Sequence, residues 1–541
     1  NAILVIPADI TAGSATLTVS MHNFKPYQTA VQVVDMPTLV PATIVIDDDS
    51  IGASSGNNNG LAGSGEILEL LFGLRNTGTA TLNGIAGTIS STNPYITIDN
   101  PNISYPAIPG GEVGVNTSSI VVHIAPNAPH ETLLRLHLNL TDAASETYHV
   151  SEFIPVEAAA MNYVSYLVSD SNNQHLDPGE TVNLSITVKN EGTVGVNGVM
   201  GRLYTLNDLV GVGDVDAIFG DLNPGTQVTT GTDNFTLIAR PEVLPGMLIP
   251  LRLKLYNDNG FEQYVEFSVT VGVVTQNDPL GPDAYGYVIY DWTDTNYADV
   301  AIYDWHGIAP SEGGVGTPVA ITDGYASGDE GDQVGTDALE VVNLPFPFQF
   351  YGILYDQITI CSNGFIAMGA TANAEFRNFR LPGAMGPSPM IAPFWDDLAT
   401  VAGSGIYTWF DRSNHSFVIQ WNNLRNGKNG TSVETFQCIL YDQAAYPTSF
   451  GDGPIKFQYH TFNNVDSQSG SNHGNFCTIG IEDHTGTRGL EYTFNNQYPT
   501  AAAQLSSGKA LFITNAPVYH AAAHLLVEAT YVNDVNGNSV C

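Results

Sequence analysis

The chain has 541 residues, 43% of them hydrophobic, and its 54 acidic and 16 basic side chains give a formal net charge of −38. Because nucleic acids and anionic lipid surfaces are bound through clustered Lys and Arg, this charge excludes a nucleic-acid partner and electrostatic docking on a membrane. No apolar run is long enough to cross a bilayer, so we expect no direct membrane insertion. Abundant Gly, Asn, Thr and Ser favour short strands and turns, and the fold class that we predict is all-β.

The first segment, residues 1–36, has strand patterns but too few strands for a domain. Its sequence "NAILVIPADITAGSATLTVSMHNFKPYQTAVQVVD" predicts about three strands, and so few strands are marginal in water on their own. We therefore expect the chain to be a segment of a longer protein. The alternative is that incomplete ends of neighbouring molecules complete each other's sheets and build a filament.

A repeat follows. "GEILELLFGLRNTGTATLNG" (65–84) and "GETVNLSITVKNEGTVGVNG" (179–198) share Gly, Glu, Leu, Asn, Gly, Thr, Asn and Gly at a constant spacing of 114 residues, from 65 to 179. Between these identities apolar and polar residues alternate, which predicts strands with one buried face. Repeats of about 115 residues have the size of an immunoglobulin-like sandwich. We predict β-sandwich repeats at 37–157 and 158–274.

The second repeat opens with "VSDSNNQHLDPGETV" (168–182), where hard oxygen ligands lie at short spacing. Oxygen ligands of this kind suit Ca²⁺, so the loop predicts a structural calcium site. The candidate ligands in this loop are Asp170, Asn172, Asp177 and Glu180. The alternative reading is a set of plain turns rich in Asp and Asn.

From about residue 275 aromatic residues become dense, and many short strand patterns follow up to residue 517. In "QITICSNGFIAMG" (357–369) a strand meets an Asn-Gly turn, which is a strong hairpin signal. We predict one large two-sheet sandwich over 275–517.

Several motifs of this large domain resemble the nidogen-like extracellular domain. They are the strand before "NG", the motif "APFWDD" and the later strands "ETFQCILYD" and "GPIKFQYHTFNN". The matching residues are Asn363, Gly364, Ala392, Pro393, Phe394, Trp395, Asp396, Phe436 and Tyr459. Because family members are adhesion and matrix modules, the resemblance implies a non-catalytic extracellular role.

The last residues, 518–541, resemble the opening of the second repeat. In "YVNDVNGNSVC" (531–541), Asp534 and Asn536 align with Asp170 and Asn172, and Asn538 continues the alternate spacing. We interpret 518–541 as the start of a further repeat, with Asp534, Asn536 and Asn538 as further calcium ligands. The alternative is an ordinary tail rich in Asn and Gly.

A second resemblance concerns the order of the modules. "ATLTVSMHNFKPYQTAVQVV" (15–34) resembles the end of the immunoglobulin-like domain that follows the catalytic domain of gingipain-like secreted bacterial cysteine peptidases. Residues 1–36 would then be the C-terminal part of such a domain. The resemblance implies a parent protein with an upstream cysteine peptidase, whose catalytic residues are not in this chain.

Within the chain itself the sequence shows no catalytic motif. We expect none of the four Cys to be a nucleophile, and Cys438 and Cys477 to face inward as thiols or as one disulfide. Asp396 and Asp397 could gather with Glu482 and Asp483 into a carboxylate cluster, although acidic turns are the simpler reading.

The sequence therefore predicts an extracellular or cell-surface segment that acts as a spacer, an adhesion region or an assembly region of a large bacterial protein. One rival hypothesis is an accessory region that positions an upstream peptidase, and another is a filament or sheath subunit. The partners that we expect are other surface proteins, matrix or glycans, or copies of the chain itself. Calcium is the cofactor that we expect.

Overall fold

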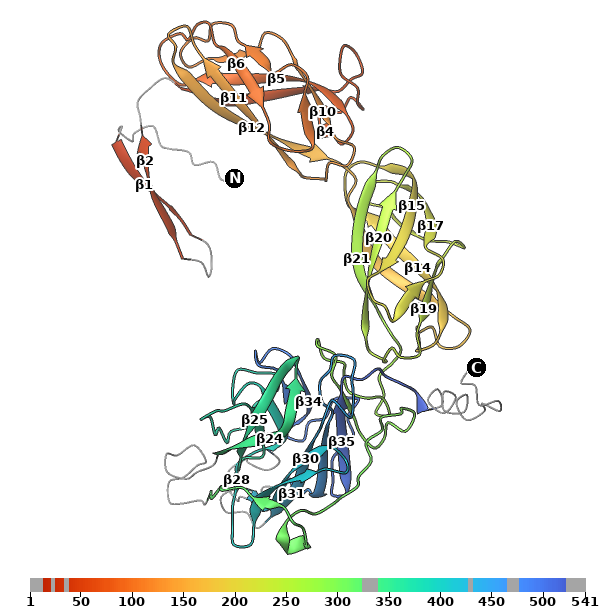
Figure 1. Ribbon diagram of the computed structural model, residues 1–541. Helices are drawn as coiled ribbons and strands as arrows, with labels where there is room; N and C mark the ends of the chain where they lie inside the picture. The colour runs from red at the N-terminus through yellow and green to blue at the C-terminus, as the bar shows by residue number, and fades with distance from the viewer. Residues whose placement is uncertain are drawn as a thin grey trace, which may run out of the picture.

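The computed structural model describes residues 13–20, 25–33, 38–323, 339–426, 432–464 and 476–521 (Figure 1). In these ranges regular structure is almost all strand, with one short 3-10 helix, η1, at Pro310–Glu312. The predicted all-β class is confirmed. Strands β1 (Gly13–Val19) and β2 (Tyr27–Val33) form a two-stranded antiparallel sheet of their own. The part of 1–36 before Gly13 lies outside the description.

Two sheets form repeat 1, in the strand orders β3-β5-β10-β7, with β9 beside β5, and β4-β12-β11-β6-β8. The bounds of the first sheet are β3 Leu39–Asp47, β5 Ile67–Asn76, β7 Ile96–Ile98, β9 Val113–Val115 and β10 Ile120–Ile124. Those of the second are β4 Ala62–Gly63, β6 Ala86–Ser90, β8 Asn102–Ser104, β11 Leu133–Thr141 and β12 Thr147–Glu157. Alternate residues of β11, Leu134 to Leu140, are fully buried between the sheets.

Repeat 2 has the same plan, with the strand orders β13-β14-β19-β16, with β18 beside β14, and β17-β15-β20-β21. The first sheet takes β13 Met161–Ser169, β14 Thr181–Asn190, β16 Val210–Val212, β18 Gln227–Thr229 and β19 Phe235–Ala239. The second takes β15 Val196–Thr205, β17 Asp216–Leu222, β20 Leu248–Tyr256 and β21 Glu262–Thr270. Each repeat therefore closes its own hydrophobic core.

The repeated Asn of the "N-x-G-T" motif organises the same corner in both sandwiches. Asn190 is fully buried, and its Nδ2 donates to the carbonyls of Val194 (2.8 Å) and Leu222 (3.0 Å). Its Oδ1 accepts the backbone N–H of Gly192 at 3.0 Å. Asn76 makes the matching three bonds in repeat 1. The motif thus marks a side chain that satisfies buried backbone groups which strands cannot reach.

The two repeats are joined by only three residues, Ala158–Ala160, between the end of β12 and the start of β13. The turn after β14 holds this linker, because Glu191 N–H donates to Ala160 O (2.7 Å) and Thr193 N–H donates to Ala158 O (3.1 Å). The linker is thus part of a hydrogen-bonded joint.

Two further sheets form the large domain, and they pack face to face around one core. The eight-stranded sheet has the order β22-β35-β32-β31-β30-β29-β23, with β28 beside β30. Its bounds are β22 Val288–Tyr290, β23 Thr317–Pro318, β28 Leu398–Ala399, β29 Gly405–Asp411, β30 Ser416–Asn426, β31 Val433–Tyr441, β32 Ile455–Thr461 and β35 Lys509–Thr514. The six-stranded sheet runs β24 Leu339–Phe350, β25 Ile353–Cys361, β26 Ile366–Met368, β27 Met390–Trp395, β33 Thr478–Glu482 and β34 Gly489–Phe494.

The "SNG" turn joins β25 to β26 as the sequence predicts. Gly364 has a φ of 73°, and a Cβ atom there would lie 1.8 Å from the carbonyl oxygen of Phe394. Only glycine fits this position, because it has a left-handed conformation and another backbone is in close contact. The turn thereby ties the hairpin to β27, the strand of the "APFW" motif.

A polar ladder crosses the outer side of the eight-stranded sheet. Gln420, Gln437 and Gln458 stand in register on β30, β31 and β32 and are buried. They bond to one another and to the backbone of the segment 304–308, which lies across the sheet. This buried amide ladder anchors the aromatic segment that the sequence shows near residue 300.

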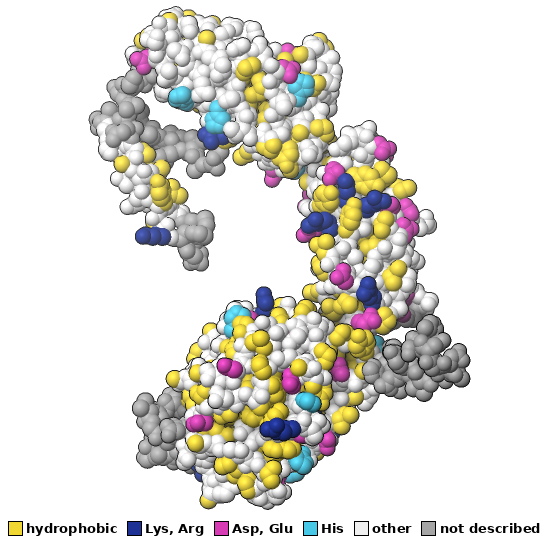
Figure 2. All heavy atoms as spheres, viewed as in Figure 1, with side chains coloured by type: hydrophobic (Ala, Val, Ile, Leu, Met, Phe, Trp, Pro, Cys, Tyr) yellow, Lys and Arg dark blue, Asp and Glu magenta, His cyan; other side chains and the backbone are white. Residues whose placement is uncertain are grey.

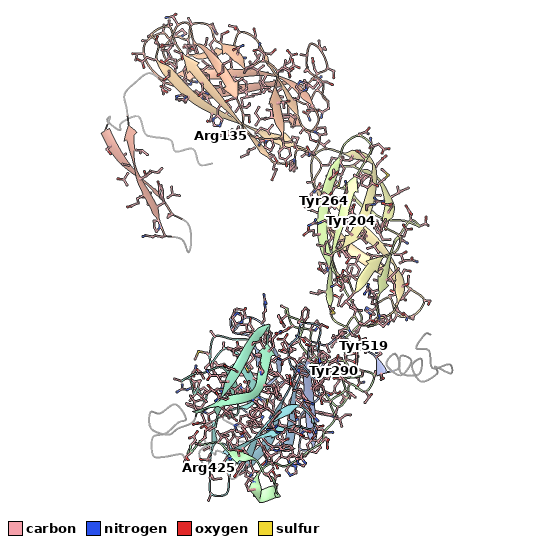
Figure 3. The ribbon with its side chains drawn as sticks, viewed as in Figure 1. Arg135, Tyr204, Tyr264, Tyr290, Arg425 and Tyr519 are labelled. Carbon is pink, nitrogen blue, oxygen red and sulfur yellow. The ribbon has the colours of Figure 1, made fainter. Side chains whose placement is uncertain are left out.

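The large domain also contacts repeat 2 through a small apolar cluster. Leu244 and Met247 of repeat 2 pack with Tyr290, Tyr297 and neighbouring side chains of the large domain. Figure 3 labels Tyr290 on the side of the large domain that faces repeat 2. Tyr290 and Leu244 are almost completely buried. The two units are therefore connected by a packed joint as well as by the chain.

Candidate functional site

The first loop of repeat 2 brings the predicted calcium ligands together. Asp170 follows β13, and its Oδ1 accepts backbone N–H groups from Asn172 (2.9 Å), Asn173 (3.1 Å) and Gln174 (3.0 Å). These hydrogen bonds lower the pKa of Asp170, and the bond from Gln174 has the largest effect. The second oxygen, Oδ2, is buried and has no hydrogen-bond partner. One carboxylate oxygen therefore shapes the loop and the other remains available.

The remaining predicted ligands of this loop bond to one another. Glu180 accepts the side-chain amide of Asn172 at 2.7 Å and the backbone N–H of Asp177 at 3.2 Å. Asp177 accepts the side-chain amide of Asn173 at 2.7 Å. In the parts of the chain that the structure describes, no three His, Cys, Asp or Glu side chains converge in a way that could hold a metal ion. The ligands Asp534, Asn536 and Asn538 lie outside the described residues.

Repeat 1 builds its corresponding loop around two buried carboxylates. Asp48 follows β3 and accepts the N–H groups of Asn59 and Gly60, both at 3.0 Å. Glu66 accepts the N–H of Gly63 at 2.8 Å. Burial raises the pKa of Glu66, and the charge of Asp48 adds to this effect. Here each Asp48 oxygen accepts a backbone N–H of the same loop, so neither oxygen is left without a hydrogen-bond partner.

The alternative carboxylate cluster does not form. Strands β27 and β33 are antiparallel, with Met390 opposite Glu482 and Trp395 opposite Thr478. Asp396 therefore lies beyond one end of the pair and Asp483 beyond the other, separated by roughly six residues or 20 Å of strand. Trp395 is completely buried and its indole N–H donates to the carbonyl of Glu375 at 2.8 Å, so it is a core residue.

The three described cysteines are buried free thiols. The disulfide considered for Cys438 and Cys477 is wrong, and the reading as inward-facing thiols is correct. Burial raises the pKa of Cys361, Cys438 and Cys477 above its ordinary value. Thiols of this kind are poor nucleophiles.

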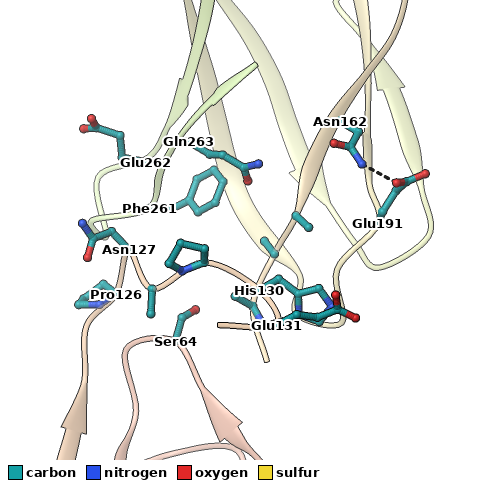
Figure 4. Close-up of a pocket in the computed structure, with 15 residues that line it drawn as sticks. Ser64, Pro126, Asn127, His130, Glu131, Asn162, Glu191, Phe261, Glu262 and Gln263 are labelled. Atoms are coloured by element: carbon teal, nitrogen blue, oxygen red, sulfur yellow. Dashed lines mark hydrogen bonds between the residues drawn. The ribbon is translucent and has the colours of Figure 1, made fainter. Parts of the chain in front are cut away.

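A cavity of about 450 Å³ lies at the joint between the repeats (Figure 4). His130 Nδ1 accepts the N–H of Ala158 at 3.2 Å, and Gln263 exchanges two bonds of 2.9 Å with the backbone of Met161. Glu131 has a φ of 59°, which is uncommon for a residue with a side chain. These hydrogen bonds hold the linker and the first strand of repeat 2 in place, and no motif in the sequence pointed to this cavity.

One buried ionisable pair of repeat 1 also escaped the sequence analysis. Glu152 on β12 points into the core, where it is 7% exposed, and its Oε1 has no hydrogen-bond partner. The hydroxyl of Tyr105 is likewise buried without a partner. Burial raises the pKa of Glu152 to about 7. The sequence "HVSEFIPV" could have predicted this burial, because Glu152 alternates with Val150 and Ile154 and so points to the same face of the strand.

Comparison with known proteins finds a family match for most of the large domain. Residues 317–519 match the NIDO-related family model. The nidogen-like prediction is thereby confirmed for this part of the chain, and domains of this type are typical of extracellular proteins. Nothing in the comparisons supports a gingipain-like origin. No curated protein matches the chain.

Three solved structures resemble parts of the chain, each with low sequence identity to it. They are red sea bream transglutaminase (10% identity, 45% of this chain and 32% of that one, TM-score 0.25), the secreted serine protease VesC from Vibrio cholerae (12%, 36% and 47%, 0.14), and a protein of unknown function from Porphyromonas gingivalis W83 (13%, 43% and 96%, 0.13). The chain therefore spans less than half of the first two proteins. No helix of the described ranges is long and apolar enough to cross a membrane.

Proposed function

We propose that this chain is a non-catalytic extracellular region that acts as a stiff spacer and presents its nidogen-like domain for adhesion. The observation that carries this proposal is the pair of packed joints. The Ala158–Ala160 linker is hydrogen-bonded to the turn after β14, and Leu244 of repeat 2 is buried against the nidogen-like domain. A linker of three residues whose backbone is hydrogen-bonded to the next module leaves the two repeats less freedom of relative motion than an unbonded linker would.

Small-angle scattering tests the spacer role. We expect the intact chain to have a narrow distribution of interatomic distances, and an insertion of Gly and Ser residues after Ala159 to broaden it. The same insertion after Gly231, an exposed loop position within repeat 2, is the matched control. A native distribution as broad as that of the linker variant would contradict a stiff arm.

Binding assays test the adhesive role. We expect the immobilised chain to bind at least one matrix glycoprotein or glycan from a panel of such ligands. The isolated segment 37–274 should bind none of them. Peptide hydrolysis by the purified chain would overturn the non-catalytic assignment. An activity found only when an upstream peptidase domain is attached would favour the rival role of positioning that peptidase.

Structural calcium in the first loop of repeat 2 is the second part of the proposal. It is supported by the unpartnered Oδ2 of Asp170 and by the oxygen-bearing side chains of Asn172, Asp177 and Glu180, which belong to the same loop. We expect calcium to raise the melting temperature of the chain and Asp170→Ala to abolish that rise. Asp48→Ala in repeat 1 should lower the stability without changing the calcium response. An Asp170→Ala variant that keeps the full calcium response would refute this site.

A further inference from the structure

The outer face of repeat 2 is the solvent side of the sheet β17-β15-β20-β21. Three rows of side chains cross its strands, as the strand pairing shows. The rows are Asp216, Arg202, Lys254 and Tyr264; then Tyr204, Arg252 and Glu266; then Ile218, Met200, Tyr256 and Glu262. Figure 2 shows hydrophobic, basic and acidic side chains mixed over repeat 2, and Figure 3 labels Tyr204 and Tyr264.

Repeat 1 shows that the fold does not require these side chains. Its strands β8, β6, β11 and β12 pair in the same order and register as β17, β15, β20 and β21. The matching rows there are Asn102, Thr88, Asn139 and His149; then Ser90, His137 and Ser151; then Ser104, Ala86, Thr141 and Thr147. Small or neutral polar residues and histidines thus stand where repeat 2 has Arg, Lys, Tyr and Glu. The large side chains of repeat 2 are an addition to a common framework.

The charges on this face cancel. Arg202 pairs with Asp216 at 2.7 Å, Arg252 with Glu266 at 2.6 Å and Lys254 with Glu262 at 2.7 Å. Three basic and three acidic groups therefore give no net charge, whereas the whole chain carries −38. Two copies of so acidic a chain repel each other over most of their surfaces, because like charges in contact are unfavourable. This neutral face is a place where they can approach.

The same face offers side chains that are typical of interface centres. Tyr204 is 41% exposed, Tyr264 is 49% exposed and Ile218 is 63% exposed. The guanidinium of Arg252 lies 5.9 Å from the ring centre of Tyr264, and the Lys254 ammonium 5.5 Å from that of Tyr256. Tyr and Arg are enriched among residues that dominate binding energy, since they combine large area with polar ends.

We propose that two copies of this chain associate through the outer faces of their second repeats, about a two-fold axis. In such an interface one surface meets itself, so it must carry both charges of each pair, as this face does. The four strands have 7, 10, 9 and 9 residues and cover roughly 400 Å² on each partner, which is less than most specific interfaces bury and is typical of weak, transient contacts. The dimer is therefore weak, with a dissociation constant on the order of micromolar. It does not depend on what the nidogen-like domain binds.

Sedimentation equilibrium of the full chain tests the proposal. We expect reversible dimerisation of the 57.7 kDa chain. The variant Tyr204→Ser, Arg252→His, Tyr264→His, which installs the residues of repeat 1, should weaken the dimer by about tenfold or more. The control variant Leu354→Ser, which changes an exposed apolar side chain of the nidogen-like domain, should dimerise like the wild type.

A charge exchange separates association from folding. Arg252→Glu alone places two acidic groups together and should abolish the dimer, while Arg252→Glu with Glu266→Arg keeps the face neutral and should restore it. Circular dichroism confirms that each variant is folded. A chain that remains monomeric up to about 100 μM, or a dimer that the triple variant leaves unchanged, would overturn the proposal.

Discussion

The buried carboxyl of Glu152 makes the stability of repeat 1 depend on pH. Burial raises the pKa of this group from 4.5 to about 7, and no basic side chain contributes to that shift. Since a tenfold change in a protonation equilibrium is worth about 1.4 kcal/mol, keeping the carboxyl ionised in the core costs about 3 kcal/mol at pH 8. The matching position of repeat 2 is Phe267, which is buried.

The sign follows from the direction of the shift. Between pH 4.5 and 7 the folded state binds the proton more tightly than the unfolded state, so rising pH removes stability. The stabilising contribution of the protonated carboxyl is complete below about pH 4.5, falls through this window and is lost above pH 7. As the pH rises from 4 to 8, we expect the free energy of unfolding of Glu152→Gln to increase relative to that of the wild type by up to about 3 kcal/mol.

Hydrogen exchange measured by mass spectrometry gives the free energy of unfolding of each repeat separately. Peptides from β11 and β12 report on repeat 1, and peptides from β20 and β21 provide an internal reference. Wild type and Glu152→Gln are compared at the same pH, and Glu112→Gln, an exposed site of repeat 1, is the matched control. A difference between wild type and Glu152→Gln that does not change with pH would refute the reasoning.

Three other predictions concern single side chains. Asn190→Ala leaves buried carbonyls unpaired and should destabilise repeat 2 by about 2–4 kcal/mol in urea unfolding, whereas the exposed Asn197→Ala should cost less than about 1 kcal/mol. In thermal melts, Gly364→Ala should destabilise the nidogen-like domain by more than about 2 kcal/mol, because the new Cβ atom would clash with a backbone oxygen. Gly403→Ala, with positive φ but open space, should cost about 1 kcal/mol in the same thermal melts. Cys438 should resist alkylation in the native chain and react after unfolding, as peptide mass spectrometry can show; rapid native labelling would contradict its burial.

Local patterns in the sequence were sufficient for the strand class, the repeat and the "SNG" hairpin, because alternation and turn residues act over a few positions. The side-chain network of Asn190 was not predictable, although its motif was, since Leu222 reaches it from 32 residues away. The separation of Asp396 from Asp483 likewise depends on β27 pairing with β33, whose register no short motif specifies. The mixed outer face of repeat 2 became visible only when strand pairing placed Arg202 beside Lys254.

The course of the strands gives repeat 2 a mechanical property. The chain enters at Met161, at the start of β13, and leaves after Thr270, at the end of β21, beside the nidogen-like domain (Figure 1). Strand β13 is bonded along its length to β14, and β21 to β20, so tension along the arm loads these ladders in shear. In shear many hydrogen bonds must break together, whereas peeling breaks them one by one. Under tension along the chain, repeat 2 would therefore resist force more strongly than its equilibrium stability alone suggests.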